Sequence, residues 1–293
     1  MYKVKIMRIT AFKDLTRVEQ TFFALPFIAT TMLLALPYTT FSFRWFCVVP
    51  AFMLARISGM AFNQLIDSKI DVRNPRTMHR VIPTGRVTPK QAHWIAWGAL
   101  FLFVGLCIQI NLLTALFALP AAFLLFIYSY MKRVHYICHI FLGLIHFLGP
   151  IMTFAALTGT LSVTIFFLGG AAACLIIGND IAYAIQDYEF DCQNALFSIP
   201  SKFGIQKSLD FSVFSQVLCT VMLLGVGLSE HLPPIYYLVL LIVGGLFLLF
   251  QRSLRKHLPT FHKIETLFFY CNVGVSFSTL LCVLLSKLWH VML

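Results

Sequence analysis

The chain has 293 residues, of which 59% are hydrophobic and only 11% are charged. This composition excludes an ordinary soluble globular protein and predicts an all-α integral membrane protein, because its apolar runs have the length of spanning helices. The formal net charge of +11 is what basic cytoplasmic loops produce, so it does not indicate a nucleic-acid partner.

Apolar runs long enough to cross a lipid bilayer recur nine times, which predicts a bundle of about nine transmembrane helices in one domain over residues 1–293. The expected spans are residues 21–38, 46–66, 92–110, 112–130, 137–156, 162–186, 211–229, 235–250 and 266–288. Residues 1–20 form a basic segment without a small-residue cleavage site. We expect this segment to lie on the cytoplasmic face of the membrane rather than to be removed as a signal peptide.

Basic residues fall almost entirely on one side of this arrangement. With a cytoplasmic N-terminus, 19 of the 22 Lys and Arg residues are cytoplasmic, Arg44 and Lys287 lie opposite, and Arg56 lies within a span. This bias predicts a multi-pass protein of the inner membrane. The longest polar connections, about 72–91 and 192–210, both follow even-numbered spans and are therefore expected on the cytoplasmic side.

The first acidic stretch ends the second span. Asn63, Asp67 and Asp71 are four residues apart, a spacing that stacks side chains along one face of an α-helix. Arg56 lies seven residues before Asn63 and so shares that face. The position predicts either a guanidinium that faces a site or a structural ion pair inside the bundle.

A second acidic stretch ends the sixth span, where Tyr183, Asp187 and Asp191 are again four residues apart. Asp67 precedes Asp187 by 120 residues, and Asp71 precedes Asp191 by the same 120. The shared offset predicts an internal repeat with one site between the two stretches. Solvated helix ends or plain ion pairs with nearby arginines are the alternative, and they account for one stretch better than for two.

Paired carboxylates beside cations indicate a particular chemistry. Carboxylate oxygens suit Mg²⁺, which keeps several waters and bridges to phosphate oxygens. Basic side chains contact phosphate oxygens directly, and the expected basic rim comprises Lys69, Arg76, Arg80, Lys132, Arg133 and Lys202. A diphosphate at a membrane boundary beside an apolar bundle indicates a prenyl diphosphate whose tail lies among the spans.

The same residues resemble the motifs of UbiA-type intramembrane aromatic prenyltransferases. The family pattern N-D-x-x-D-x-x-x-D is matched by Asn63, Asp67 and Asp71, but Gln64 replaces the common Asp at the second position. The pattern R-T-x-x-R-x-x-P-x-G is present as Arg76, Thr77, Arg80, Pro83 and Gly85. The pattern Y-x-x-x-D-x-x-x-D is present as Tyr183, Asp187 and Asp191, and Y-x-x-M-K-R as Tyr128, Met131, Lys132 and Arg133.

The resemblance covers nearly the whole chain and implies a reaction. The sequence around Gln64 and Ser198 is similar to the 4-hydroxybenzoate polyprenyltransferase branch, part of which is linked to the futalosine route to menaquinone. It implies transfer of a polyprenyl group from a polyprenyl diphosphate to the ring of an aromatic acid, 4-hydroxybenzoate or a dihydroxynaphthoate, in ubiquinone or menaquinone biosynthesis. The implied mechanism is Mg²⁺-assisted departure of the diphosphate, followed by attack of the electron-rich ring on the allylic cation.

The resemblance also implies residue roles. The expected catalytic residues and Mg²⁺ ligands are Asp67, Asp71, Asp187 and Asp191. The expected substrate-binding residues are Asn63, Arg56, Arg76, Arg80, Lys132, Tyr183 and Arg17, with Arg56 the candidate for the carboxylate of the acceptor. Tyr183 orients an aspartate, shields the cation or packs. Asp180, seven residues before Asp187, is as ambiguous as Arg56.

Two rival functions stay open. Intramembrane acids and internal repeats also mark transporters, but a transporter predicts acids near the middle of the bilayer on broken helices. A haem-prenylating member of the same family is the other rival, supported only by His135, His139 and His146 on one helix face. Histidines in such positions are more often packed and neutral than ligating.

Overall fold

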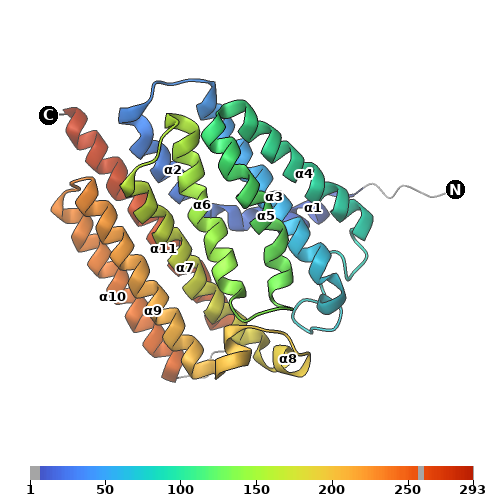
Figure 1. Ribbon diagram of the computed structural model, residues 1–293. Coiled ribbons are helices and arrows are strands. Elements are labelled where there is room, and N and C mark those ends of the chain that lie inside the picture. Colours follow the sequence, from blue (N-terminus) through green and yellow to red (C-terminus); the bar gives the residue numbers. More distant parts are fainter. Residues whose placement is uncertain (1–6, 257–260, 293) are drawn as a thin grey trace.

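The computed structural model describes residues 7–256 and 261–292, and this part of the chain contains helices and no strand (Figure 1). The long helices are α2 (Thr21–Ala35), α3 (Phe43–Asp71), α4 (Pro89–Ile110), α5 (Leu112–Met131), α6 (Cys138–Thr158), α7 (Val163–Ala184), α9 (Ile199–Ser229), α10 (Pro234–Lys256) and α11 (Phe261–Met292). Two short helices, α1 (Ile9–Thr16) and α8 (Tyr188–Gln193), complete the fold. Residues 1–6 of the expected basic segment lie outside the described part.

The long helices have the properties of membrane spans. Seven described helices are long and apolar enough to cross a bilayer, and the apolar segments Ala24–Tyr38 and Pro234–Leu249 are shorter. Large apolar side chains such as Phe101, Leu119 and Leu241 remain exposed on the outside of the bundle, where water would disfavour them and lipid would not. The prediction of an all-α integral membrane protein with about nine spans is confirmed.

The bundle has two groups of helices, each with its own apolar cluster. Helices α1, α3, α4 and α5 pack with residues 81–87 around Phe62 and Leu125. Helices α2, α6, α7 and α9–α11 surround the other cluster, which includes Phe154 and Leu168. Figure 1 shows α3–α5 on one side of α6 and α9–α11 on the other. Helix α7 therefore lies between neighbours on both faces.

Close contact between α7 and α9 depends on a small residue. A Cβ atom on Gly178 would lie 2.9 Å from the carbonyl oxygen of Ser212, so a larger residue would push the helices apart. The same approach lets the Ser212 hydroxyl donate a hydrogen bond of 2.7 Å to the carbonyl oxygen of Gly178. Polar and small residues thus fix the position of the helix that carries the second acidic stretch.

The prediction of a long connection after α3 is confirmed, whereas the prediction of a long connection over residues 192–210 is wrong. Residues 72–88 form turns between α3 and α4, as expected. Helix α9 begins at Ile199, so only residues 194–198 connect it to α8. Ser198 caps α9 by accepting a hydrogen bond from the backbone N–H of Ser201, and Gly204, with φ 79° and ψ 167°, kinks the helix. The polar composition of residues 199–210 concealed this amphipathic first part of α9.

Candidate active site

The first acidic stretch lies on the last two turns of α3, as its spacing predicts. Asn63 donates hydrogen bonds from Nδ2 to Asp67 Oδ2 at 3.1 Å and to the Tyr128 hydroxyl at 3.2 Å. Arg133 Nη2 lies 2.9 Å from Asp67 Oδ1, and Arg80 Nη1 lies 2.9 Å from Asp71 Oδ2. Each carboxylate of this stretch is therefore neutralised by one arginine.

The second acidic stretch does not form the continuous helical face that the sequence predicted. Helix α7 ends at Ala184, a 3₁₀ turn covers Ile185–Asp187, and α8 starts at Tyr188. Asp187, with φ −98° and ψ 5°, joins the two helices, so Asp191 belongs to a different helix from Tyr183. The spacing of four residues is consequently kept in sequence but not in helix geometry.

Two basic segments neutralise the second stretch. Arg76 binds Asp187 with two hydrogen bonds, Nε to Oδ1 at 2.9 Å and Nη2 to Oδ2 at 2.6 Å. Lys132 Nζ lies 2.9 Å from Asp191 Oδ1 and 3.8 Å from Asp187 Oδ2. Asp191 Oδ2 also accepts a hydrogen bond of 3.0 Å from the hydroxyl of Ser198. The two aspartates thus lie among cations and donors rather than in open water.

These ion pairs set the charge state of the basic residues between the helices. Burial acts to lower the pKa of Lys132, but the carboxylates of Asp191 and Asp187 outweigh it and hold that pKa above its ordinary value. Burial also opposes the charge on Arg76, and its hydrogen bonds to Asp187 raise the pKa of Arg76 in the same way. Both side chains are therefore firmly cationic near neutral pH.

Most of the other predicted residues lie around this cluster. Tyr183 accepts a hydrogen bond of 3.1 Å from Arg76 Nη1, and the Arg76 guanidinium carbon lies 5.1 Å from the centre of its ring. Arg17 follows α1, and its guanidinium is close enough to Arg80 and Arg76 that burial and then their charges lower its pKa. By contrast, Lys69 and Lys202 are exposed and form no ion pair with any described residue.

Sequence reasoning missed Asn74. Its Nδ2 donates a hydrogen bond of 3.0 Å to Asp187 Oδ1, and its Oδ1 accepts one of 2.9 Å from the backbone N–H of Arg76. Asn74 therefore holds the arginine and the aspartate together. The sequence signal that could have identified Asn74 is its place directly before Pro75, in the loop after the first stretch.

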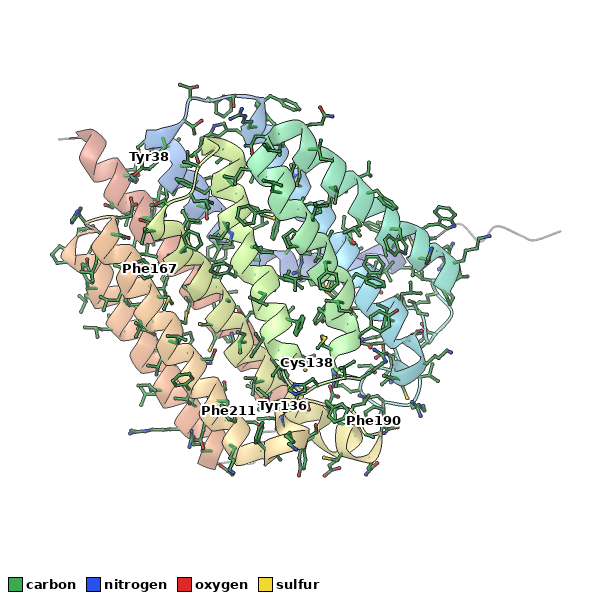
Figure 2. The ribbon with its side chains drawn as sticks, viewed as in Figure 1. Tyr38, Tyr136, Cys138, Phe167, Phe190 and Phe211 are labelled. Atoms are coloured by element: carbon green, nitrogen blue, oxygen red, sulfur yellow. The ribbon has the colours of Figure 1, made fainter. Side chains whose placement is uncertain are left out.

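The loops that bear these groups lie at one end of the bundle. The backbone N–H of Phe197 donates a hydrogen bond of 2.8 Å to the carbonyl oxygen of Lys132, joining the α8–α9 connection to the α5–α6 connection. Figure 2 shows Tyr136 and Phe190, which flank the two connections, at this same end. All four aspartates thus lie at one end of the helices and not in the middle of the bundle.

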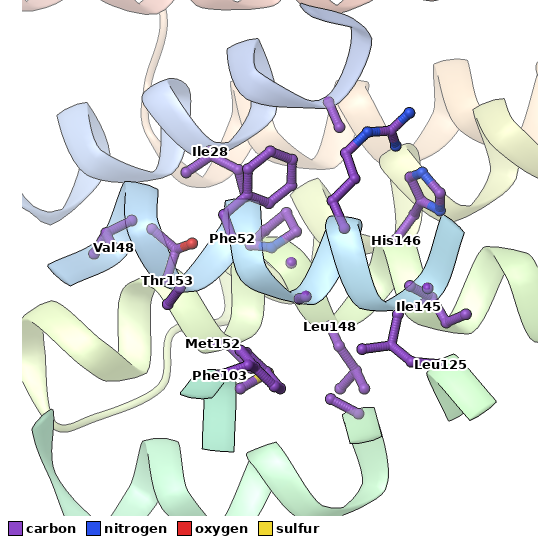
Figure 3. Close-up of a pocket in the computed structure, with 18 of the residues that line it drawn as sticks. Ile28, Val48, Phe52, Phe103, Leu125, Ile145, His146, Leu148, Met152 and Thr153 are labelled. Atoms are coloured by element: carbon purple, nitrogen blue, oxygen red, sulfur yellow. The ribbon is translucent and has the colours of Figure 1, made fainter. Parts of the chain in front are cut away.

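An apolar cavity of about 170 Å³ lies inside the bundle between α2, α3, α4, α5 and α6 (Figure 3). Its wall is formed mainly by aliphatic and aromatic side chains, including Phe52, Phe103 and Leu148. Polar groups in the wall include Arg56, Tyr128 and His146. Figure 3 shows His146 far from Val48, which lies toward the other end of the cavity.

One hydrogen-bond chain connects the cavity to the aspartates. The Tyr128 hydroxyl in the cavity wall accepts from Asn63, and Asn63 donates to Asp67. Arg56 lies about two turns before Asn63 on the same helix, and its Nε donates a hydrogen bond of 3.0 Å to the Thr21 hydroxyl. The first acidic stretch is therefore linked by hydrogen bonds to the wall of the apolar cavity.

The histidines expected on one face do not converge. His135 is exposed in the turn before α6, and His146 lines the cavity, with Nδ1 2.9 Å from the Leu142 carbonyl oxygen. His139 is buried, with Nδ1 2.7 Å from Asp180 Oδ2, and its Nε2 accepts a hydrogen bond of 3.3 Å from the backbone N–H of Ile199. Asp180 thus has a structural partner, and the trio gives no support to haem ligation.

The residues present fit a substrate-bridged Mg²⁺ ion better than an enclosed metal site. No group of three or more His, Cys, Asp or Glu side chains in the described part is placed to hold a metal ion. The four carboxylates instead come as two pairs of hard oxygen donors, which leave coordination positions for water and phosphate oxygens. Arg80 Nε, buried without a hydrogen-bond partner among the described residues, is a donor available to an anion.

The sequence is similar to those of known proteins. Residues 24–285 match the model of the UbiA prenyltransferase family. The chain is 33% identical to a 4-hydroxybenzoate octaprenyltransferase of Vibrio campbellii over 209 residues, covering 70% of this chain and 71% of that protein. It is 28% identical to the protein of the same name from Serratia proteamaculans over 207 residues, covering 71% of both.

Solved structures share the fold. A UbiA homologue from Aeropyrum pernix superposes with a TM-score of 0.79 at 21% identity, covering 92% of this chain and 98% of that one. A UbiA homologue from Archaeoglobus fulgidus, bound to GPP and Mg²⁺, superposes with a TM-score of 0.67 at 16% identity, covering 93% and 99%. The protein therefore belongs to the UbiA prenyltransferase family.

Proposed function

We propose that this protein transfers a polyprenyl group from a polyprenyl diphosphate to the ring of an aromatic acid in a Mg²⁺-dependent reaction. The observation that carries the proposal is an apolar cavity whose wall is joined to the first of four paired aspartates by hydrogen bonds through Tyr128 and Asn63. A diphosphate and its hydrocarbon tail need these two environments side by side. The names of the bacterial relatives support the aromatic acceptor.

The aspartates and cations divide the work on the diphosphate. Asp67, Asp71, Asp187 and Asp191 would hold Mg²⁺, which when bound supplies positive charge to the departing diphosphate. The cations that neutralise these carboxylates, Arg76, Arg80, Lys132 and Arg133, are the groups that would contact phosphate oxygens. A preorganised ring of donors stabilises the charge that develops as the carbon–oxygen bond breaks.

The cavity receives the remaining reactants. Its aliphatic and aromatic wall excludes water, which would otherwise capture the allylic cation. Arg56, in the wall and close to the helix turn of Asn63, would hold the carboxylate of the acceptor. Tyr183, which accepts a hydrogen bond from Arg76, would both orient Arg76 on Asp187 and shield the cation.

The acceptor is 4-hydroxybenzoate or a dihydroxynaphthoate, and the product serves ubiquinone or menaquinone synthesis. The sequence around Gln64 and Ser198 supports these two acids, and the names of the relatives support 4-hydroxybenzoate. The site would open to the cytoplasm, because the basic residues that flank it follow the rule for cytoplasmic loops. A transporter is less well supported, since the acids cluster at one end of the spans rather than at their middle.

Purified protein in lipid nanodiscs, incubated with Mg²⁺, prenyl diphosphates of several lengths and a panel of aromatic acids, tests the proposal. We expect mass spectrometry to detect a C-prenylated acid and inorganic diphosphate. Equal turnover of acceptors with and without a carboxylate would contradict the role of Arg56. Absence of any prenylated product with every acid in the panel would contradict the proposed function itself.

A further inference from the structure

Gln64 has a role that the aspartate motif does not give it. Its side chain is 1% exposed in α3, and Nε2 donates hydrogen bonds of 2.8 Å to the carbonyl oxygens of both Asp14 and Leu15. These carbonyls belong to the last turn of α1, where a helix has no partners of its own for its C=O groups. Gln64 therefore closes the C-terminal end of α1 from a different helix.

The interaction needs an amide. Both partners of Gln64 Nε2 are acceptors, so an Asp or Glu carboxylate at this position would place negative oxygen against two carbonyl oxygens. The common Asp of the family pattern would also be too short and could not donate. At the position where the family pattern commonly has Asp, this chain thus has an amide that binds the end of α1.

The residue that follows this anchored end is Arg17. It adopts a left-handed conformation with φ 45° and ψ 52°, which a residue with a side chain holds only when its surroundings fix it. Arg17 has no hydrogen-bond or ion-pair partner among the described residues. Burial and then the charges of Arg80 and Arg76 lower the pKa of Arg17. Asp71 and Asp187 already pair with those two arginines, so Arg17 is the cation of the three that a bound anion could neutralise.

We propose that Gln64 is a positioning residue that anchors α1 and thereby holds Arg17 beside Arg76 and Arg80, where Arg17 contacts the diphosphate of the prenyl substrate. This role rests on the proposed function. Gln64 is not itself in contact with the substrate. Its effect on binding passes through α1 and the backbone of Arg17.

An ion pair between Arg86 and Asp14 also holds α1, but it cannot replace the hydrogen bonds from Gln64. Arg86 Nη1 lies 2.6 Å from Asp14 Oδ2, but both side chains are about half exposed, at 47% and 50%. Exposed pairs of this kind contribute little. The apolar contacts of Leu15 and Ala11, both buried, keep α1 on the bundle, while Gln64 fixes the position of its last turn.

The test uses Gln64→Met and Gln64→Glu, with Gln109→Met as a matched control at an exposed position in the last turn of α4. Binding of geranyl diphosphate with Mg²⁺ is measured by calorimetry on protein in nanodiscs. We expect about tenfold weaker binding for Gln64→Met and a larger loss for Gln64→Glu, since a charge-assisted contact is misplaced. Trypsin should cleave both variants faster after Lys13 and Arg17, whereas Gln109→Met should match the parent.

A double-variant cycle separates positioning from general destabilisation. Arg17→Gln alone should weaken binding about 10- to 100-fold, and adding Gln64→Met should change it by less than about twofold, because the contact is already gone. Multiplied effects, or parental binding by Gln64→Met, would overturn the role of Gln64 while leaving the proposed function intact. A parent protein that does not bind geranyl diphosphate would overturn both.

Discussion

The two acidic stretches have the same spacing but different backbones. In the first, α3 continues without a break through Asp71, whereas in the second a 3₁₀ turn separates α7 from α8 at Asp187. The difference shows in exposure, because the side chain of Asp67 is 18% exposed and that of Asp191 is 0% exposed. The side chains of Asp71 and Asp187 are 6% and 7% exposed, so equal sequence spacing leaves Asp67 alone of the four carboxylates partly open.

The cations divide between the stretches in a crossed pattern. Of the adjacent residues Lys132 and Arg133, the lysine binds Asp191 and the arginine binds Asp67. The loop after α3 divides in the same way, because Arg80 turns back to its own stretch while Arg76 crosses to Asp187. The crossing joins the two helix groups, so the stretches form one site and not two independent ones.

Removal of the metal should have the largest effect, because the proposed Mg²⁺ ligands come from both stretches. Treatment with EDTA should abolish prenyl transfer, and added Mg²⁺ should restore it. Without Mg²⁺, four carboxylates and a diphosphate would repel each other. Product formation is followed by mass spectrometry, and parental turnover in metal-free buffer would rule out the Mg²⁺ role.

Loss of one carboxylate should be the next largest effect and should be similar in both stretches. Asp67→Asn and Asp187→Asn keep the shape of the side chain and remove its charge. Turnover should fall about 10²-fold or more in each variant, the usual cost of one missing electrostatic contact in a transition state. The control Asp210→Asn, in an exposed ion pair with Arg255, should be near the parent. A folded variant of either stretch with parental turnover would contradict the mechanism.

Stability should distinguish the most buried carboxylate, Asp191, from the most exposed one, Asp67, where turnover does not. Asp191→Asn leaves Lys132 without its nearest partner in an enclosed place, and should cost about 1–3 kcal/mol of unfolding free energy. Asp67→Asn removes a more exposed pair and should cost less than about 1 kcal/mol. Thermal unfolding in one detergent measures both. Equal shifts in Tm would show that burial does not separate the Lys132–Asp191 pair from the Arg133–Asp67 pair.

The crossed pairing makes a finer prediction about coupling. In double-variant cycles on thermal stability, Lys132→Met should couple to Asp191→Asn, and Arg133→Met to Asp67→Asn, each by about 0.5 kcal/mol or more. The exchanged combinations should be additive within about 0.5 kcal/mol. If Lys132 coupled to Asp67 as strongly as to Asp191, the crossed pattern of ion pairs would be contradicted.

The smallest effect expected is that of pH on Lys132. Its pKa is raised in the folded protein, so the stability that it contributes is complete below the unfolded value of about 10.4 and is lost as the pH rises through the folded pKa. The difference in Tm between the parent and Lys132→Met should therefore stay constant from about pH 7 to about pH 9. A difference that shrinks in this range would show that Lys132 is not held by its carboxylates.

Much of the fold could be predicted from sequence patterns within single segments, without knowing what each segment packs against. Apolar runs of spanning length have one structural solution in a bilayer, because every backbone group must find its hydrogen bond inside the helix. The positions of Asp67 and Asp71 on one helix face also followed from spacing alone, since α3 has no breaking residue between them. Spacing misled at Asp187, because local propensity does not show where a helix changes to a 3₁₀ turn.

By itself, the sequence determined the class of protein, the residues of the two stretches and the basic segments that serve them. Only the tertiary structure decided which cation meets which carboxylate, that Asn74 and Ser198 complete the second stretch, and that Gln64 holds α1. The physical reason is that hydrophobic periodicity and charge bias are properties of single segments. Ion pairs and hydrogen bonds between α3, α5, α8 and the loops depend on distances that are fixed only when the helices pack.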